Sequence, residues 1–87
     1  MSWTIEFDKH SLKQLKKLDK PTAKRIVDYM DEVSKLDDPA SRGKGLTDNL
    51  AGLWRYRVGD YRVICDIQKE IVTVFVVEVG HRSEIYD

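Results

Sequence analysis

Residues 53–68 have the sequence LWRYRVGDYRVICDIQ, in which two apolar-rich runs flank the dipeptide Gly59-Asp60. A two-residue connection with glycine first is typical of a type II′ turn in a β-hairpin. The stretch therefore predicts a hairpin with one strand over residues 53–58 and the next over Tyr61–Gln68. One side of this hairpin is apolar and is expected to be buried beneath helices; it carries Trp54, Tyr56, Val58, Val63, Cys65 and Ile67.

The other side of the predicted hairpin is basic. With Gly59-Asp60 as the turn, Arg57 lies directly opposite Arg62, and like charges in that position destabilise a sheet. Arg55 shares their face because side chains alternate with a period of two along a strand. A bound polyanion would explain three converging guanidiniums, since the planar fork of arginine matches phosphate geometry. The alternative is neutralisation within the protein by Asp66, Glu78 or Glu84.

The rest of the chain supplies helices and further strands. Residues 3–7 alternate as a strand, and Asp8 is a plausible N-cap for a helix over residues 9–18. Pro21 marks the start of a second helix, which ends before Asp37-Asp38-Pro39. The helices carry apolar stripes, Leu12, Leu15 and Leu18 on the first and Ala23, Ile26, Val27, Met30 and Val33 on the second, with Leu36 as a candidate extension.

The C-terminal part completes the predicted sheet. Residues 37–52 are expected to form a loop. Residues 71–79 are apolar on both faces, which is typical of a central strand covered on two sides. The order β-α-α-β-β-β predicts a single α+β domain over residues 1–87, with two helices on one face of a mainly antiparallel sheet.

The composition alone does not define a partner. The 87 residues contain 15 Lys+Arg and 15 Asp+Glu, so the net charge is zero. The charges are segregated, however: residues 9–25 hold seven basic residues and one acid, residues 28–38 are acidic, and residues 42–62 are again basic. A basic face is what a nucleic acid recognises, so the zero total does not exclude one.

The composition also bears on localisation. A single cysteine, no apolar stretch of membrane-spanning length and no signal-peptide pattern at the N-terminus predict a cytoplasmic protein with no membrane partner.

Two motifs resemble the RelE/ParE superfamily of bacterial and archaeal toxins, and the resemblance covers nearly the whole chain. They are WRYRVGDYRV at residues 54–63 and VGHRSEIY at residues 79–86. The resemblance implies a RelE-like microbial ribonuclease-type fold and a toxin of a type II toxin–antitoxin system. It implies a metal-independent endoribonuclease that cleaves mRNA in the ribosomal A site by attack of the 2′-hydroxyl on the adjacent phosphate. The alternative within the superfamily is a ParE-like inhibitor that binds DNA gyrase. An inactive RNA-binding homologue and a non-toxin domain with internally paired arginines also stay open.

The resemblance also implies roles for individual residues. The catalytic candidates are Arg57, Arg62, His81, Arg82 and Tyr86, and the candidates for binding RNA phosphates are Lys44, Arg55, Arg57 and Arg62. Arginine stands at positions 55 and 57, where the best-known members carry lysine. Either His81 or Arg82 matches the family arginine at the end of the last strand, and alternation continued from Arg62 through a turn at Lys69-Glu70 places His81 on the arginine face.

The partners implied by the resemblance are a RelB-like antitoxin, in a hetero-oligomer with the toxin, and the ribosome with its mRNA. Lys13, Lys16 and Lys17 on the first helix are candidate contacts with ribosomal RNA, or else a solvated helix face. No cofactor is expected. No metal site is expected either, because two histidines and one cysteine show no ligand spacing.

Overall fold

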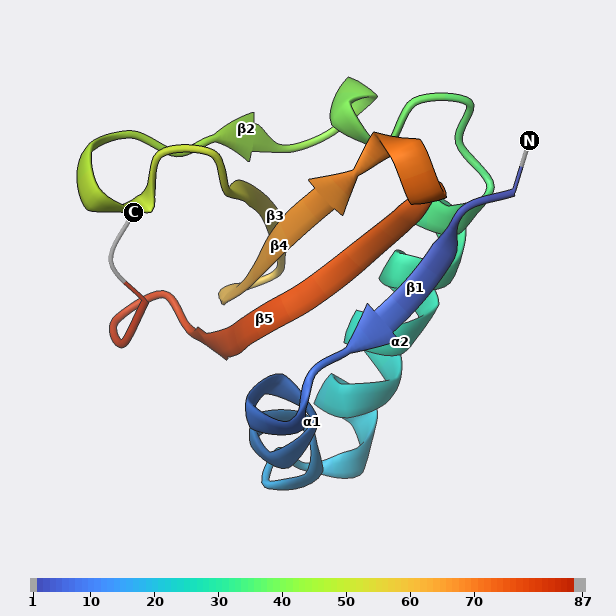
Figure 1. Cartoon of the computed structure of the whole chain (residues 1–87). Coiled ribbons are helices and arrows are strands. Elements are labelled where there is room, and N and C mark those ends of the chain that lie inside the picture. Colours follow the sequence, from blue (N-terminus) through green and yellow to red (C-terminus); the bar gives the residue numbers. More distant parts are fainter. Residues whose placement is uncertain (1, 86–87) are drawn as a thin grey trace.

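A five-stranded sheet with two helices on one side makes up the computed structural model, which describes residues 2–85 (Figure 1). The sheet order is β1-β5-β4-β3-β2, in which only the β1–β5 pair is parallel. The elements are β1 (Thr4–Phe7), α1 (Lys9–Lys16), α2 (Lys20–Ser34), β2 (Lys44–Gly45), β3 (Trp54–Val58), β4 (Tyr61–Gln68) and β5 (Thr73–His81). The predicted fold class is confirmed, and β2 is a short addition within the segment that was expected to be a loop.

Two aspartates define the helix starts. The Asp8 carboxylate accepts a hydrogen bond from the Ser11 N–H at 2.8 Å, as predicted for the N-cap of α1. The Asp19 carboxylate accepts from the Thr22 N–H at 3.2 Å, and Pro21 lies in the first turn of α2. Each cap satisfies a backbone donor that the helix itself leaves without a partner.

The predicted helix stripes are only partly correct. Helix α1 ends at Lys16, two residues before the predicted end, and α2 ends at Ser34, before Leu36. Leu12 is 38% exposed and Val27 is 44% exposed. In α1 the small side chain of Ser11 is fully buried instead, because this face of the helix lies directly against β5.

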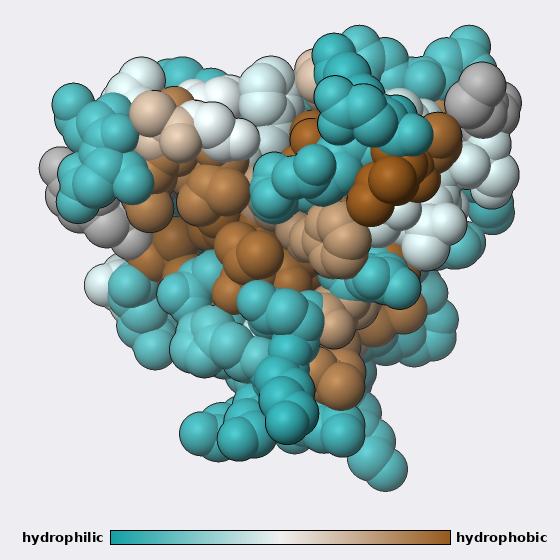
Figure 2. Space-filling view, in the orientation of Figure 1, coloured by the Kyte–Doolittle hydropathy of each residue, from teal (hydrophilic) through white to brown (hydrophobic). Residues whose placement is uncertain are grey.

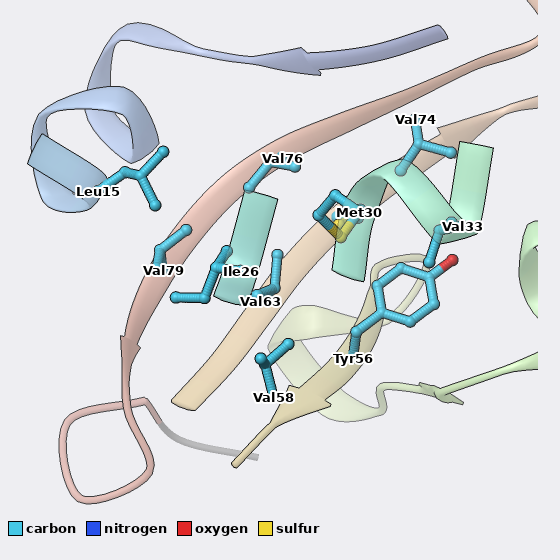
Figure 3. Close-up of a cluster of buried hydrophobic side chains, with 11 residues drawn as sticks. Leu15, Ile26, Met30, Val33, Tyr56, Val58, Val63, Val74, Val76 and Val79 are labelled. Atoms are coloured by element: carbon cyan, nitrogen blue, oxygen red, sulfur yellow. The ribbon is translucent and has the colours of Figure 1, made fainter. Parts of the chain in front are cut away.

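The hydrophobic core lies between α2 and the sheet (Figure 3). Ile26, Met30 and Val33 of α2 are at most 1% exposed. They pack among the apolar side of the predicted hairpin, whose Tyr56, Val58, Val63 and Cys65 are all buried. Burial raises the pKa of the Cys65 thiol far above its ordinary value, so this cysteine is a core residue rather than a nucleophile.

The hairpin has the predicted register, with Val58 opposite Tyr61 and Arg57 opposite Arg62. Gly59 has a φ of 60°, whereas Asp60 is not among the residues of positive φ. This is the pattern of a type II′ turn. The turn therefore fixes which arginines face each other.

Replacing Gly59 by alanine should lower the free energy of unfolding by about 1–2 kcal/mol, since an L-residue pays that cost at a positive φ. The new methyl group would also lie 3.0 Å from the Arg25 guanidinium, which must move aside. Urea unfolding monitored by tryptophan fluorescence measures the loss. An unchanged midpoint would contradict the assignment of the turn.

Residues 37–52 are more ordered than predicted. Two short 3₁₀ turns, Pro39–Ser41 and Asp48–Leu50, flank β2, which pairs Lys44 with Arg55. The Tyr56 hydroxyl donates to the Pro39 carbonyl at 2.6 Å, and the Trp54 indole N–H donates to the Arg42 carbonyl at 2.7 Å. These hydrogen bonds hold the segment against β3. They join residues 12 and 17 positions apart, so no local sequence pattern predicts them.

Strand β5 is central, as predicted, but only its helix side is fully covered. On the other side Phe75 and Val77 are half-buried. Figure 2 shows apolar surface in the middle of the view, bordered by hydrophilic residues. The expectation of a strand buried on both faces is therefore wrong for this second face, and Ile71, in the turn before β5, is 60% exposed.

A β-bulge in β5 changes the face of its last residues. Cys65 is opposite Val76 and Ile64 is opposite Glu78, so Val77 is an extra residue. An extra residue reverses the alternation of every side chain beyond it. Val79 consequently lies in the core under the helices, and His81, two residues later, shares its side. The prediction that His81 lies on the arginine face is wrong for this reason.

No helix in the described part of the chain has the length and apolar character that crossing a bilayer requires.

Candidate nucleic-acid interface

Four cationic residues share the sheet face that points away from the helices. Lys44 lies opposite Arg55, and Arg57 lies opposite Arg62, on three consecutive strands. Their neighbours Tyr56 and Val63 point into the core, so alternation places all four on the other side. We call this set, Lys44, Arg55, Arg57 and Arg62, the basic face.

The two halves of the basic face differ in exposure. Arg55 and Arg62 are each only 8% exposed, whereas Lys44 and Arg57 are exposed. The Arg62 guanidinium donates to the Tyr61 carbonyl at 3.3 Å. The buried arginines thus have a fixed arrangement, and the exposed lysine and arginine remain accessible to a ligand.

Two of the three acids considered as internal counter-ions have other hydrogen-bond partners. Asp66 accepts from the Gln68 amide at 2.7 Å. Glu78 accepts from His10 at 2.8 Å and from Gln14 at 3.0 Å, on the α1 side of the molecule. The third, Glu84, is exposed in the turn that follows β5.

Two hollows border the basic face. An open cleft of about 410 Å³ at the β2–β3 edge is lined by Tyr29, Gly43, Lys44, Arg55 and Arg57. A second hollow of about 310 Å³, the apolar basin, is lined by Leu50, Leu53, Ile64, Val77, Glu78, Glu84 and Ile85. Ile64 lies opposite Arg55, so the basin and the arginines share one sheet face. The cations of the basic face therefore lie beside an apolar surface.

His81 lies in a different place from the basic face. It is opposite Tyr61, with the two ring centroids 5.5 Å apart in an edge-to-face arrangement. Both line a cleft of about 420 Å³ against α1, together with His10, Gln14, Lys17, Leu18, Val79, Gly80 and Glu84. His81 Nδ1 is 2.9 Å from the Ser83 hydroxyl.

Arg82 follows His81 and is exposed. Its backbone N–H donates to the Asp60 carbonyl at 2.8 Å, which continues the pairing of β4 and β5 by one position. Alternation then assigns Arg82, and not His81, to the side of the basic face. Of the two candidates for the family arginine, the fold therefore favours Arg82.

The remaining candidates lie apart from the basic face or outside the described residues. Lys13, Lys16 and Lys17 are exposed on α1, which packs on β5 and β1, whereas Lys44 belongs to the opposite edge of the sheet. Tyr86 lies outside residues 2–85. Within that range no three potential metal ligands come together.

Tyr29 and Gln14 are site residues that sequence reasoning missed. Tyr29 lines the cleft beside Lys44 and stacks under the Arg42 guanidinium, 5.7 Å from its ring centroid. Gln14 bonds to β5 across 65 residues. No sequence motif indicates a functional role for either residue, because each has the position of an ordinary residue in an amphipathic helix.

Comparison with known proteins places this chain in a family. Residues 5–86 match the family model described as "ParE toxin of type II toxin-antitoxin system, parDE". The chain belongs to the RelE/ParE family of type II toxins. The match covers every described strand and both helices apart from the first residue of β1.

The relatives of this family member include both sequences and structures. This chain is 32% identical over 87 residues to toxin RelG of Mycobacterium tuberculosis, and the alignment covers 99% of this chain and 98% of that protein. The toxin–antitoxin complex RelBE2 of the same species has a chain that superposes with a TM-score of 0.86 at 29% identity, with 97% and 95% coverage. A chain of the archaeal RelE–RelB complex from Pyrococcus horikoshii gives a TM-score of 0.74 at 24% identity, with 98% and 100% coverage, and so shares the fold.

Proposed function

We propose that this toxin is a metal-independent, ribosome-dependent endoribonuclease that cleaves mRNA in the ribosomal A site. The observation that carries the proposal is the pairing of Arg57 with Arg62 beside Arg55 and Lys44 on one sheet face. Opposed like charges weaken a sheet, so their retention favours a polyanionic ligand. The full-length similarity to toxin RelG supports the same assignment.

The proposed reaction is an internal phosphoryl transfer within RNA. The 2′-oxygen forms a bond to the adjacent phosphorus, and the bond from phosphorus to the 5′-oxygen of the next nucleotide breaks. The 2′-hydroxyl loses a proton and the departing 5′-oxygen gains one, which leaves a 2′,3′-cyclic phosphate and a 5′-hydroxyl. Negative charge builds up on the phosphoryl oxygens in the transition state, where preorganised cations are most effective.

The basic face supplies such cations. In this proposal the exposed Arg57 binds the scissile phosphate bidentately and the exposed Lys44 holds a neighbouring phosphate, while the buried Arg55 and Arg62 add to the positive field. Arg82 approaches from the end of β5. Tyr86 stays the candidate base or base-stacking group that the family pattern implies. His81, on the side of α1, is assigned no proton transfer here.

We also propose that the partner of this toxin is a RelB-like antitoxin. The M. tuberculosis and P. horikoshii relatives were crystallised as toxin–antitoxin complexes. An antitoxin with acidic and apolar side chains would complement the basic face and the adjacent apolar basin, and would thereby block the RNA site.

A second candidate function is inhibition of DNA gyrase. The family model that matches residues 5–86 is named for the ParE toxin, which favours this alternative. In that case the basic face would contact a protein or its DNA, and no RNA would be cleaved.

Primer extension on ribosomes programmed with a defined mRNA separates the two candidates. We expect the purified toxin to produce cleavage within the A-site codon and to leave gyrase supercoiling unchanged at the same concentration. Added EDTA, at a level that leaves the ribosomes intact, should not reduce cleavage. Intact mRNA together with inhibited supercoiling would overturn the nuclease proposal and establish the alternative.

A further inference from the structure

Helix α1 continues the edge of β5 beyond the point where β1 ends. The last β1–β5 pair is Phe7 with Val76. The Val76 carbonyl accepts from the Asp8 N–H at 3.0 Å and from the fully buried Ser11 hydroxyl at 2.7 Å. Three residues on, the Val79 N–H donates to the side-chain oxygen of Gln14 at 2.6 Å. Side chains of α1 thus replace a neighbouring strand.

These hydrogen bonds bracket the β-bulge. The extra residue, Val77, lies between the Val76 carbonyl and the Val79 N–H, and α1 holds both groups. Gln14 also donates from its amide nitrogen to the Glu78 carboxylate at 3.0 Å. One half-buried glutamine therefore holds the backbone of Val79 and the side chain of Glu78, the two residues that follow the extra one.

We infer that Gln14 is a positioning residue for the end of β5: it holds the bulge that turns His81 toward α1 and Arg82 toward the basic face. A strand shifted by one residue presents all its later side chains on the opposite face. Without the bulge Val79 would pair with Arg62, His81 would share the sheet face of the arginines, and Arg82 would belong to the side of α1. The catalytic part of this inference rests on the proposed endonuclease function, whereas the structural part does not.

Gln14 acts at a distance from the RNA. The side chain lies on the helix side of the sheet, in the cleft that also contains Tyr61 and His81. Its replacement should change the placement of Arg82 without removing any charge from the basic face. Because small misplacements of catalytic groups cost up to about 100-fold in rate, we expect kcat to fall about tenfold and KM for programmed ribosomes to stay within about twofold.

Exchanging the two polar partners gives the sharpest test. Gln14→Met removes both hydrogen bonds at similar length. Gln14→Glu keeps an acceptor for the Val79 N–H but opposes it to the Glu78 carboxylate. In the double variant Gln14→Glu/Glu78→Gln the amide nitrogen on position 78 donates one hydrogen to the new carboxylate and the other to the unprotonated Nε2 of His10, so both hydrogen bonds are restored with their direction reversed. We expect both single variants to lose about tenfold in kcat and the double variant to regain wild-type kcat within about twofold. Gln68→Met, which removes an amide hydrogen bond to Asp66 at the other end of β4, is the matched control and should leave kcat unchanged.

A structural measurement separates this inference from the proposed function. In ¹⁵N-labelled toxin, Gln14→Met should speed hydrogen exchange of the Val79 amide at least tenfold and shift the amide signals of residues 80–82, and the double variant should reverse both changes. If the wild-type protein cleaves no RNA, the proposed function is contradicted, but the expected NMR changes are unaffected. Unchanged signals for residues 80–82 in Gln14→Met, or a double variant as impaired as Gln14→Glu, would overturn the inference. If Gln14→Met fails to fold, the comparison of Gln14→Glu with the double variant decides it.

Discussion

Replacing Arg57 by glutamine is expected to lower the rate of mRNA cleavage about 100-fold or more without reducing the stability of the toxin. Removal of one preorganised donor from a charge-stabilising site typically costs 10²–10³ in rate. Arg57 is exposed and lies directly opposite Arg62, so its charge opposes folding instead of supporting it. Neutralising it should raise the free energy of unfolding by up to about 1 kcal/mol.

Single-turnover primer extension on programmed ribosomes measures the cleavage rate, and urea unfolding measures the stability. Lys69→Gln provides the control, because Lys69 is an exposed cation in the turn before β5. It should change neither quantity appreciably. An Arg57→Gln variant that cleaves at the wild-type rate would remove Arg57 from the site. A variant that loses activity only in proportion to lost stability would show a structural role instead.

Arg82→Gln should lower the cleavage rate about 30-fold or more, whereas His81→Gln should change it by less than about threefold. The reason is the bulge at Val77, which places His81 on the helix side of the sheet, so that alternation continued one position beyond β5 assigns Arg82 to the other side. Arg82 then lies on the side of the arginines, and His81 packs edge-to-face on Tyr61 beside α1.

The same primer-extension assay, followed between pH 5.5 and 8, tests this second expectation. A side chain that transferred the proton would shape the pH profile of cleavage, and its removal would change that shape. We expect His81→Gln to leave the shape of the profile unchanged. A pH profile that changes shape in His81→Gln, with Arg82→Gln fully active, would reverse the assignment of the two residues.

The local sequence was sufficient for the hairpin and the helix starts. Gly59-Asp60 defined the turn, and the turn defined the opposition of Arg57 and Arg62, because a two-residue connection leaves one register. Asp8 and Asp19 cap their helices through hydrogen bonds to a backbone three residues away, which is a purely local interaction. The resemblance to the RelE/ParE family rested on the motifs at residues 54–63 and 79–86, and the family match over residues 5–86 confirms it.

Two features were decided by tertiary structure: the β-bulge in β5, which is a single extra residue, and strand β2, which is held by residues far away in the chain. Simple alternation along β5 predicted that His81 lies on the face of the arginines. The bulge at Val77 inverts the alternation beyond it, and no residue type in the sequence indicates that a bulge occurs there. Strand β2 exists because β3 offers a free edge and because Tyr56 and Trp54 bind the carbonyls of Pro39 and Arg42.

The sequence by itself thus determined both helices, four of the five described strands, the turn and the basic hairpin, since these depend mainly on patterns among residues close in the chain. Only the tertiary structure decided which end residue faces the arginines. That choice depends on two hydrogen bonds between α1 and β5, each joining residues 65 positions apart: the Ser11 hydroxyl donates to the Val76 carbonyl, and the Val79 N–H donates to the side-chain oxygen of Gln14. An amphipathic pattern predicts that a helix face is buried, but it does not state which backbone groups that face will bind.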